Sequence, residues 1–106
     1  MTTDAKTIEI FVGGDYDQAR HICRQFCAST PCCVTVTQTS FCYTGGEEAG
    51  VVVGLRSYAR FPTSDGDLMD RARSLALELI DGLGQASAMV ADEWDHEWVT
   101  KNNDVA

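Results

Sequence analysis

The spacing of apolar residues along the chain predicts four β-strands. In a strand, successive side chains point to opposite faces, so an apolar residue at every second position marks a strand with one buried side. Residues Ile8, Ile10 and Val12 show this alternation most clearly, and the later segments are rich in Val, Thr and aromatic residues, which favour strands. The predicted strands cover residues 7–12, 32–43, 51–61 and 86–91.

Two further segments repeat apolar residues every three or four positions, which predicts helices. The first helix is expected over residues 16–28, with Asp15 as its N-cap and Gln18 completing a capping box. The second helix is expected to begin after Ser64, with Asp67 in the equivalent position. Its apolar stripe consists of Leu68, Ala72, Leu75, Ala76, Leu79 and Leu83.

The order of these elements predicts an α+β fold, the ferredoxin-like β-α-β-β-α-β sandwich. In this arrangement both helices cover one face of an antiparallel sheet and leave the other face open. The glycine-containing stretch 44–50 is expected to connect the two middle strands as a hairpin. A chain of 106 residues has the usual size of one domain, so we expect a single domain over 1–106 with a frayed tail from about residue 100 to 106.

The charge balance limits the partners that we expect. The chain has 16 acidic and 8 basic residues, and its formal net charge is −8. Because nucleic acids and anionic membranes are bound through Lys and Arg, we expect neither as a partner. The sequence shows no charged-then-apolar leader and no run of about eighteen apolar residues, so we expect a cytoplasmic protein.

The first four of the five cysteines are expected to pack in the core rather than to bind metal, and a disulfide framework is not expected. The odd number of cysteines and a reducing compartment argue against a disulfide framework. Cys23 and Cys27 lie on the apolar stripe of the first helix, where cysteine behaves as a small hydrophobe. Together with Cys32 and Cys33 they lack the two CxxC-like pairs of a zinc site, which makes zinc the weaker interpretation. Cys42 is expected to be the exposed thiol.

The open face of the predicted sheet combines aromatic side chains with arginines. A half-solvated sheet normally carries polar residues on its open side. Here that side is expected to show Phe11, Tyr58, Arg56 and Arg60 beside several threonines. Three interpretations stay open: a slightly apolar exposed surface, a subunit interface, or a ligand-binding face.

As a ligand-binding face, this surface would suit a small anion that carries a flat ring. Arg56 and Arg60 flank Tyr58 and would hold a phosphate group. Tyr58 or Phe11 would stack on the ring, and Glu9 lies on the same face. These five residues are the predicted ligand-binding residues.

As an interface, the same face would be covered by further copies of the chain. Val52 lies on the open face and Tyr43 lies beside the predicted hairpin. The acidic segment 92–99 carries Trp94 and Trp98, which would share one face of a helix and anchor this segment on a neighbouring subunit. A divalent-cation site on its carboxylates is the weaker interpretation, because their spacing fits no EF-hand loop.

The layout of the chain resembles the CutA-type proteins and their relatives, the PII signalling proteins. The likeness lies in chain length, in the strand segment Cys33-Val34-Thr35-Val36, in the hairpin Tyr43-Thr44-Gly45-Gly46-Glu47 and in a tryptophan-bearing tail. This resemblance implies a homotrimer whose open sheet faces turn inward, with ligand clefts between subunits near the hairpin. The sequence also resembles small proteins of tailed bacteriophages, which implies a location in the host cytoplasm.

These features together predict a non-enzymatic homo-oligomer, a trimer by the resemblance, that binds a small anionic, nucleotide-like ligand without metal or cofactor. In a phage it would sequester a host defence signal. The alternative is an acidic protein that binds and inhibits a basic host protein, such as a nucleic-acid-binding defence complex. An enzyme is the third interpretation: no nucleophile–base pair or metal motif is recognised, although several chains can assemble a site together.

Overall fold

A computed structural model describes residues 6–101, which form two helices and five strands. The elements follow one another in the order β-α-β-β-α-β-β. Their bounds are β1 Thr7–Gly13, α1 Tyr16–Ser29, β2 Val34–Tyr43, β3 Gly46–Arg56, α2 Asp65–Leu83, β4 Ser87–Ala91 and β5 His96–Thr100.

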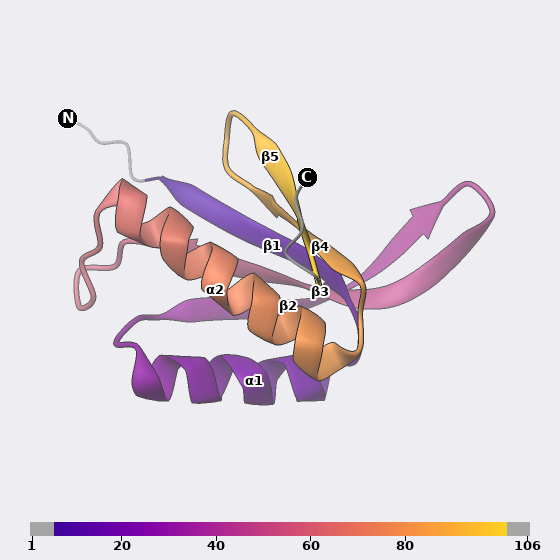
Figure 1. Cartoon of the computed structure of the whole chain (residues 1–106), viewed down its shortest axis with the longest axis horizontal. Helices are drawn as coiled ribbons and strands as arrows, with labels where there is room; N and C mark the ends of the chain where they lie inside the picture. Colours follow the sequence, from indigo (N-terminus) through magenta and orange to yellow (C-terminus); the bar gives the residue numbers. More distant parts are fainter. Residues whose placement is uncertain (1–5, 102–106) are drawn as a thin grey trace.

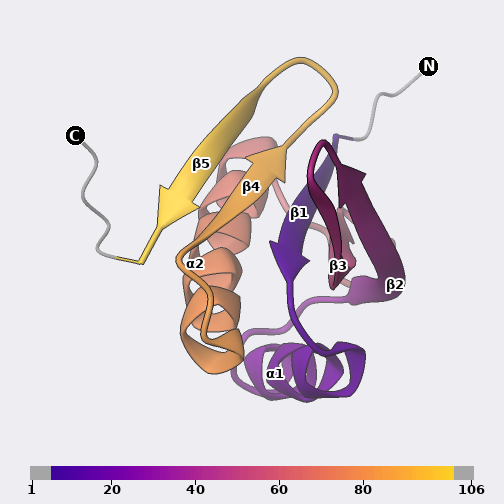
Figure 2. The same cartoon turned by 90° about the vertical axis from the view of Figure 1, so that its right-hand side faces the viewer.

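The strands form one antiparallel sheet in the order β2-β3-β1-β4-β5. Helix α1 packs against β2 and β3, and α2 packs against β1, β4 and β5, with the two helices in contact with each other. Figures 1 and 2 show that both helices lie on the same side of the twisted sheet. The predicted α+β, ferredoxin-like sandwich is therefore confirmed, with one strand more than expected.

The core lies between the helices and the sheet, as the alternation in the sequence predicts. Ile8, Ile10 and Val12 of β1 are buried, and so are Val51, Val53 and Leu55 of β3, which pair with them across the sheet. The buried residues of α2 complete this layer: Leu68, Ala72, Leu75, Ala76, Leu79 and Ile80.

Both predicted N-caps are present. The amide of Gln18 donates to the Asp15 carboxylate over 3.0 Å, and the amide of Asp67 donates to the Ser64 hydroxyl over 3.2 Å. Each bond satisfies one of the backbone donors that a helix leaves free in its first turn. Helix α2 ends at Gly84, whose φ of 68° lies in the left-handed region that glycine adopts without strain.

The predicted hairpin between the two middle strands is present, but its connection is shorter than 44–50, because pairing of β2 with β3 continues through most of this stretch. Tyr43 pairs with Gly46, and only two residues, Thr44 and Gly45, separate the strands. Gly45 has a φ of 97°, a conformation that a two-residue hairpin turn favours. The result is a long hairpin that projects from the rest of the molecule (Figure 1).

The predicted strand over 51–61 also ends earlier than expected, at Arg56. Arg56 pairs with Thr7, the first residue of β1, so β3 has no partner on that side beyond this point. The chain turns instead, and the amide of Phe61 donates to the carbonyl of Tyr58 over 2.9 Å. Tyr58 and Arg60 consequently do not continue the open face of β3.

The acidic segment 92–99 is neither a helix nor a tail, which corrects the prediction. Residues His96–Thr100 form β5, an edge strand paired with β4. Thr100 ends this strand, and residues 102–106 of the predicted frayed tail lie outside the described part of the chain. Within residues 6–101, no helix is long and apolar enough to cross a membrane.

Candidate functional site

The face that the helices leave open carries one row of side chains in register across all five strands. Phe11 of β1 pairs with Val52 on one side and with Met89 on the other. The row continues through Met89 to Trp98 and through Val52 to Thr37. Three of its members, Val52, Phe11 and Met89, are half-buried, although no helix covers them. The centre of the open face is therefore apolar, and it carries Phe11 and Val52, which the sequence predicts on this face, but not the arginines predicted beside them.

A cavity of about 580 Å³ opens beside this row, at the end of the sheet from which the hairpin projects. All five strands and the connection between α2 and β4 contribute to its wall. The lining residues are Phe11, Val12, Gly13, Phe41, Glu48, Gln85, Ala86, Ser87, Met89 and Trp98.

Two glycines of the strands let large side chains lie close to the backbone at this cavity. A Cβ atom at Gly50 would clash with the ring of Phe41, so this ring lies directly over the Gly50 backbone. A Cβ atom at Gly13 would clash with the Glu48 carboxylate and would lie 3.2 Å from the amide oxygen of Gln85. The absence of these two side chains therefore brings an aromatic ring, a carboxylate and an amide to the cavity.

The cavity combines aromatic walls with a single negative charge. Phe11, Phe41 and Trp98 provide three aromatic rings from three strands. Among the lining residues, all of which belong to the described part of the chain, Glu48 is the only charged one. Aromatic faces and a carboxylate both attract cations. The cavity is therefore suited to a flat ligand with a positive charge rather than to an anion.

A second cavity, of about 490 Å³, lies between α1 and the edge strand β2 and has different chemistry. Arg20 and Arg24 line it beside Cys27. The guanidinium of Arg20 lies 6.0 Å from the centre of the Tyr16 ring and 3.9 Å from the Asp17 carboxylate.

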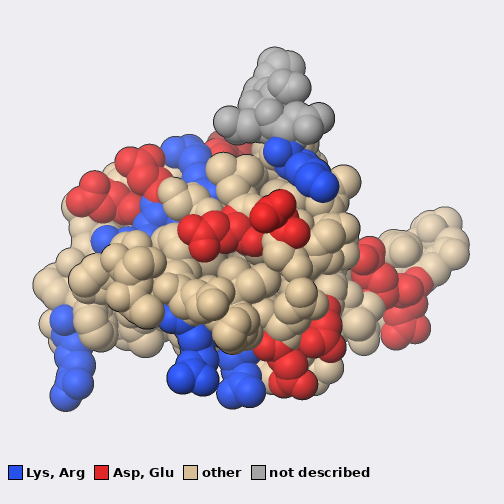
Figure 3. Space-filling view, turned by 60° about the horizontal axis from the view of Figure 1, so that its bottom comes forward, with Lys and Arg blue, Asp and Glu red and all other residues tan. Residues whose placement is uncertain are grey.

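Figure 3 shows the underside of the molecule, where acidic and basic side chains lie in several separate groups.

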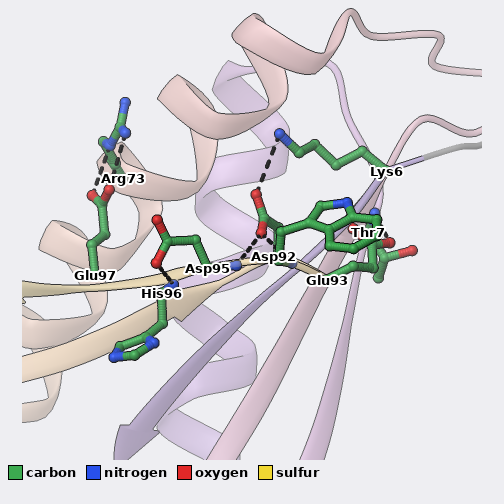
Figure 4. A network of polar contacts seen from close by, with 9 residues as sticks. Lys6, Thr7, Arg73, Asp92, Glu93, Asp95, His96 and Glu97 are labelled. Atoms are coloured by element: carbon green, nitrogen blue, oxygen red, sulfur yellow. Dashed lines mark hydrogen bonds and ion pairs between the residues drawn. The ribbon is translucent and has the colours of Figure 1, made fainter.

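The acidic residues before β5 form a structural turn (Figure 4). The Asp92 carboxylate accepts bonds from the amides of Trp94 and Asp95, each 2.8 Å long, and lies 3.4 Å from the ammonium group of Lys6. The pKa of Asp92 is held below its usual range by the hydrogen bonds that its carboxylate accepts from the backbone amides, that of Trp94 first, and by the positive charge of Lys6. Within residues 6–101, no group of three or more His, Cys, Asp or Glu side chains is arranged to hold a metal ion. The Asp92 carboxylate stabilises the turn through its two bonds from backbone amides.

Next to this turn, Arg73 of α2 binds Glu97 of β5 through two hydrogen bonds of 2.8 and 3.0 Å. Such a two-point contact between guanidinium and carboxylate is stronger than a single ion pair. The hydrogen bonds from Arg73 lower the pKa of Glu97, and those to Glu97 raise the pKa of Arg73. This pair fastens the edge strand to the helix behind it.

The structure separates the predicted ligand-binding residues. Phe11 lines the cavity, whereas Arg56, Tyr58, Arg60 and Glu9 do not. Arg56 pairs with Thr7, four residues before Phe11, which corresponds to about 13 Å along a strand. Glu9 is exposed on the open face between these two positions. A role of the two arginines and Tyr58 in ligand binding stays a prediction, and it would concern a place apart from the cavity.

The predicted interface residues are spread along the open side and the hairpins. Trp98 is 66% exposed at the rim of the cavity, and Trp94 is 90% exposed on the turn before β5. Tyr43 is 54% exposed at the end of the projecting hairpin, and Val52 is half-buried in the central row. Their role in an interface between copies stays a prediction.

Sequence reasoning missed most of the cavity. The sequence places Glu48 in the predicted connection 44–50. It does not show on which face of the sheet Phe41 lies, because the register of the hairpin cannot be read from the sequence. Gln85 follows Gly84, which ends α2 and directs the chain back toward the sheet. A two-residue turn at Thr44 and Gly45 would have placed Phe41. With this turn Phe41 pairs with Glu48, and its ring lies beside Gly50.

Comparison with known proteins found no matching protein-family model and no matching curated protein. Solved structures of a phage SAM lyase share the fold. The lyase in complex with S-methyl-5′-thioadenosine has a TM-score of 0.64 at 14% identity and covers 91% of this chain and 89% of its own. The apo lyase has a TM-score of 0.70 at 17% identity and covers 90% of this chain and 88% of its own.

These structures correct our functional prediction. Both are structures of an enzyme, whereas the sequence predicted a non-enzymatic protein that sequesters an anionic signal, or an acidic inhibitor of a basic host protein. That prediction is wrong. The neighbours do support the resemblance to small phage proteins, while no family match supports the resemblance to CutA or PII proteins.

The Arg73–Glu97 pair predicts a pH-dependent contribution to stability. Because the folded-state pKa of Glu97 is lowered from 4.5, the pair stabilises the protein above this pH and loses its effect as the pH falls through the folded pKa. Both side chains are partly exposed, so we expect Glu97→Gln to reduce the free energy of unfolding at pH 7 by about 0.2–1 kcal/mol. Thermal unfolding of both proteins should show a difference that shrinks from pH 7 to pH 3. Glu47→Gln, on the exposed hairpin, serves as the control, and an unchanged difference at pH 3 would contradict the assignment.

Proposed function

We propose that this chain is an enzyme that binds S-adenosylmethionine (SAM) or a similar sulfonium nucleoside and releases a thioether nucleoside from it. The observation that carries the proposal is the cavity at the hairpin end of the sheet, which has three aromatic rings and one carboxylate in its wall. The fold shared with a phage SAM lyase over about nine-tenths of the chain supports it.

The chemistry of SAM matches the lining of this cavity. SAM joins a flat adenine ring to a sulfur atom that carries a positive charge. An adenine ring stacks on aromatic side chains such as Phe11, Phe41 or Trp98, and each such contact contributes about 1–3 kcal/mol. The sulfonium is attracted by the same aromatic faces and by the Glu48 carboxylate.

Exclusion of water from the cavity favours the proposed bond cleavage. S-methyl-5′-thioadenosine keeps the methyl and adenosyl groups of SAM, so its release requires cleavage between the sulfur and the four-carbon amino acid portion. The electron pair of that bond goes to the sulfur, which becomes neutral, while an oxygen of the substrate's own carboxylate bonds to the carbon that the sulfur leaves and closes a lactone. When the open face is covered and water is excluded, the energy of the charged substrate rises more than that of a transition state in which the charge is disappearing. This loss of hydration lowers the barrier as far as it exceeds the attraction of the aromatic rings and Glu48 for the cation.

Glu48 gives the site a preference for substrate over product. Its side chain is exposed, and its carboxylate lies above Gly13 near the amide oxygen of Gln85, so the charge is placed at the wall of the cavity. It attracts the positively charged sulfur or the ammonium group of SAM. The neutral thioether product lacks both charges, so its binding depends on ring stacking alone. This difference favours product release.

A second copy of the chain is the partner that we propose for the open face. The central row ends at Trp98, which is 66% exposed, and the cavity beside it is open to solvent on the side away from the helices. Large aromatic side chains in an apolar setting are typical of interface centres. Covering this face would exclude water from the cavity.

The proposed enzyme is tested by comparing Glu48→Gln with its neighbour Glu47→Gln. Wild-type protein should convert SAM to S-methyl-5′-thioadenosine, measured by chromatography of the nucleosides. Glu48→Gln should weaken SAM binding roughly ten- to hundredfold, because a charge-assisted contact is lost. Binding of the thioether, measured by calorimetry, should change by less than about threefold because this ligand carries no charge at sulfur.

Glu47 provides a matched control, since it lies one residue away on the same hairpin and does not line the cavity. Its replacement by Gln should leave both affinities unchanged. No release of thioether from SAM by the wild-type protein would contradict the lyase proposal. Equal effects of the two substitutions would contradict the assignment of the site.

The proposed assembly is tested by native mass spectrometry and light scattering of the full chain. We expect more than one copy per particle at micromolar concentration, and we expect Trp98→Ala to shift the distribution toward single copies. A wild-type particle that contains one copy under both methods would contradict an interface on this face.

A further inference from the structure

Two cysteine sulfurs lie close together at the junction between α1 and β2. Cys27 is in the last turns of α1, and Cys32 is in the short connection that leads into β2. Their Sγ atoms are 3.7 Å apart, and both side chains are half-buried. This is van der Waals contact between two thiols, close to the separation from which a side-chain rotation forms a disulfide.

The surroundings keep the Cys32 thiol protonated under ordinary conditions. Burial and the hydrogen bond with Cys27 raise the pKa of Cys32 to about 11, although the positive charge of Arg71 acts in the opposite direction. Cys23, which lies nearby on α1, is buried, and its pKa is raised to about 12 mainly by burial. Cys33 is the remaining thiol that acts on Cys32. Because the thiolate is the reactive form, the pair stays reduced unless an oxidant is supplied.

We propose that Cys27 and Cys32 form a redox modification site, which closes into a disulfide when a small disulfide such as oxidised glutathione is abundant. The proximity of the two sulfurs carries this inference. It is independent of the proposed lyase activity, because neither cysteine lines the cavity at the hairpin end.

The cavity between α1 and β2 gives the oxidant access. Cys27 is among its lining residues, together with Arg20 and Arg24. The two arginines also suit the carboxylates of glutathione. Cys27 is therefore the sulfur that meets the oxidant, and Cys32 is the sulfur that resolves the intermediate.

The exchange proceeds in two balanced steps. The Cys27 thiolate attacks one sulfur of the oxidised glutathione, forming a mixed disulfide and releasing one glutathione thiolate. The Cys32 thiolate then attacks the Cys27 sulfur, which forms the Cys27–Cys32 bond and releases the second glutathione thiolate. The protein loses two protons and two electrons, and one glutathione disulfide becomes two molecules of glutathione.

The bond would fasten the end of α1 to the start of β2. The connection between them includes Pro31 and pairs with no other strand. A cross-link at this place limits the freedom of the unfolded chain and so stabilises the folded one. The oxidised protein should therefore unfold at a higher temperature than the reduced protein.

The test uses the full chain, with Cys42→Ser in the wild-type protein and in every variant because the exposed Cys42 thiol would itself retain glutathione, incubated at pH 8.5 with oxidised glutathione and analysed by intact mass spectrometry. Wild-type protein should lose about 2 Da, with no retained glutathione, and its melting temperature should rise by about 5–10 °C. Dithiothreitol should reverse both changes. Cys32→Ser should not lose this mass and should instead retain one glutathione on Cys27, about 305 Da, whereas Cys27→Ser should show neither change, because the sulfur that meets the oxidant is missing.

Cys33→Ser is the matched control, because Cys33 is the immediate neighbour of Cys32 and should be dispensable for the bond. The melting temperatures of all reduced variants establish that each one folds. Disulfide formation in Cys32→Ser, seen as the loss of about 2 Da, together with no such loss in Cys33→Ser would overturn the assignment of Cys32 as the partner of Cys27. Wild-type protein that only accumulates glutathione, without losing 2 Da, would also overturn it.

Discussion

The packing of both helices on a single face of the sheet is the constraint on which the rest of the structure depends. Ile8, Ile10 and Val12 are buried against the helices, so the residues between them must point to the other face. Phe11 is one of these, and the register joins it to Met89 and, one strand further, to Trp98. No element of the described chain covers this row, and its apolar character is therefore available to a ligand or to another copy.

The cavity arises where this open face meets the projecting hairpin. Gly50 admits the ring of Phe41 against the backbone, and Gly13 admits the carboxylate of Glu48. Because side chains lie over these two glycines, the end of the sheet forms a concave site with aromatic walls and one negative charge. The sign of that charge is the reason why we favour a sulfonium nucleoside over the anionic ligand that the sequence predicted. The cavity lined by Arg20 and Arg24 lies between α1 and β2 and carries positive instead of negative charge.

The sequence predicted those parts of the fold that local rules determine. Alternation identified Ile8, Ile10 and Val12 as core residues, and Asp15 was recognised as a cap because its spacing to Gln18 is itself the signal. The errors concern properties that depend on distant partners. Strand β3 ends at Arg56 because β1 begins at Thr7, and β5 exists because β4 offers it a free edge. Glu48 could not be placed in a site before the register of the hairpin was known, since a one-residue slip moves every side chain to the other face.

The central claim is that the cavity at the hairpin end of the sheet binds the nucleoside part that a sulfonium substrate and its thioether product share. A crystal structure of the full chain grown with S-methyl-5′-thioadenosine tests it most directly, because the position of the nucleoside is observed rather than inferred. We predict adenine stacked on Phe11, Phe41 or Trp98 in this cavity. Nucleoside bound instead between α1 and β2, beside Arg20 and Arg24, would contradict this account.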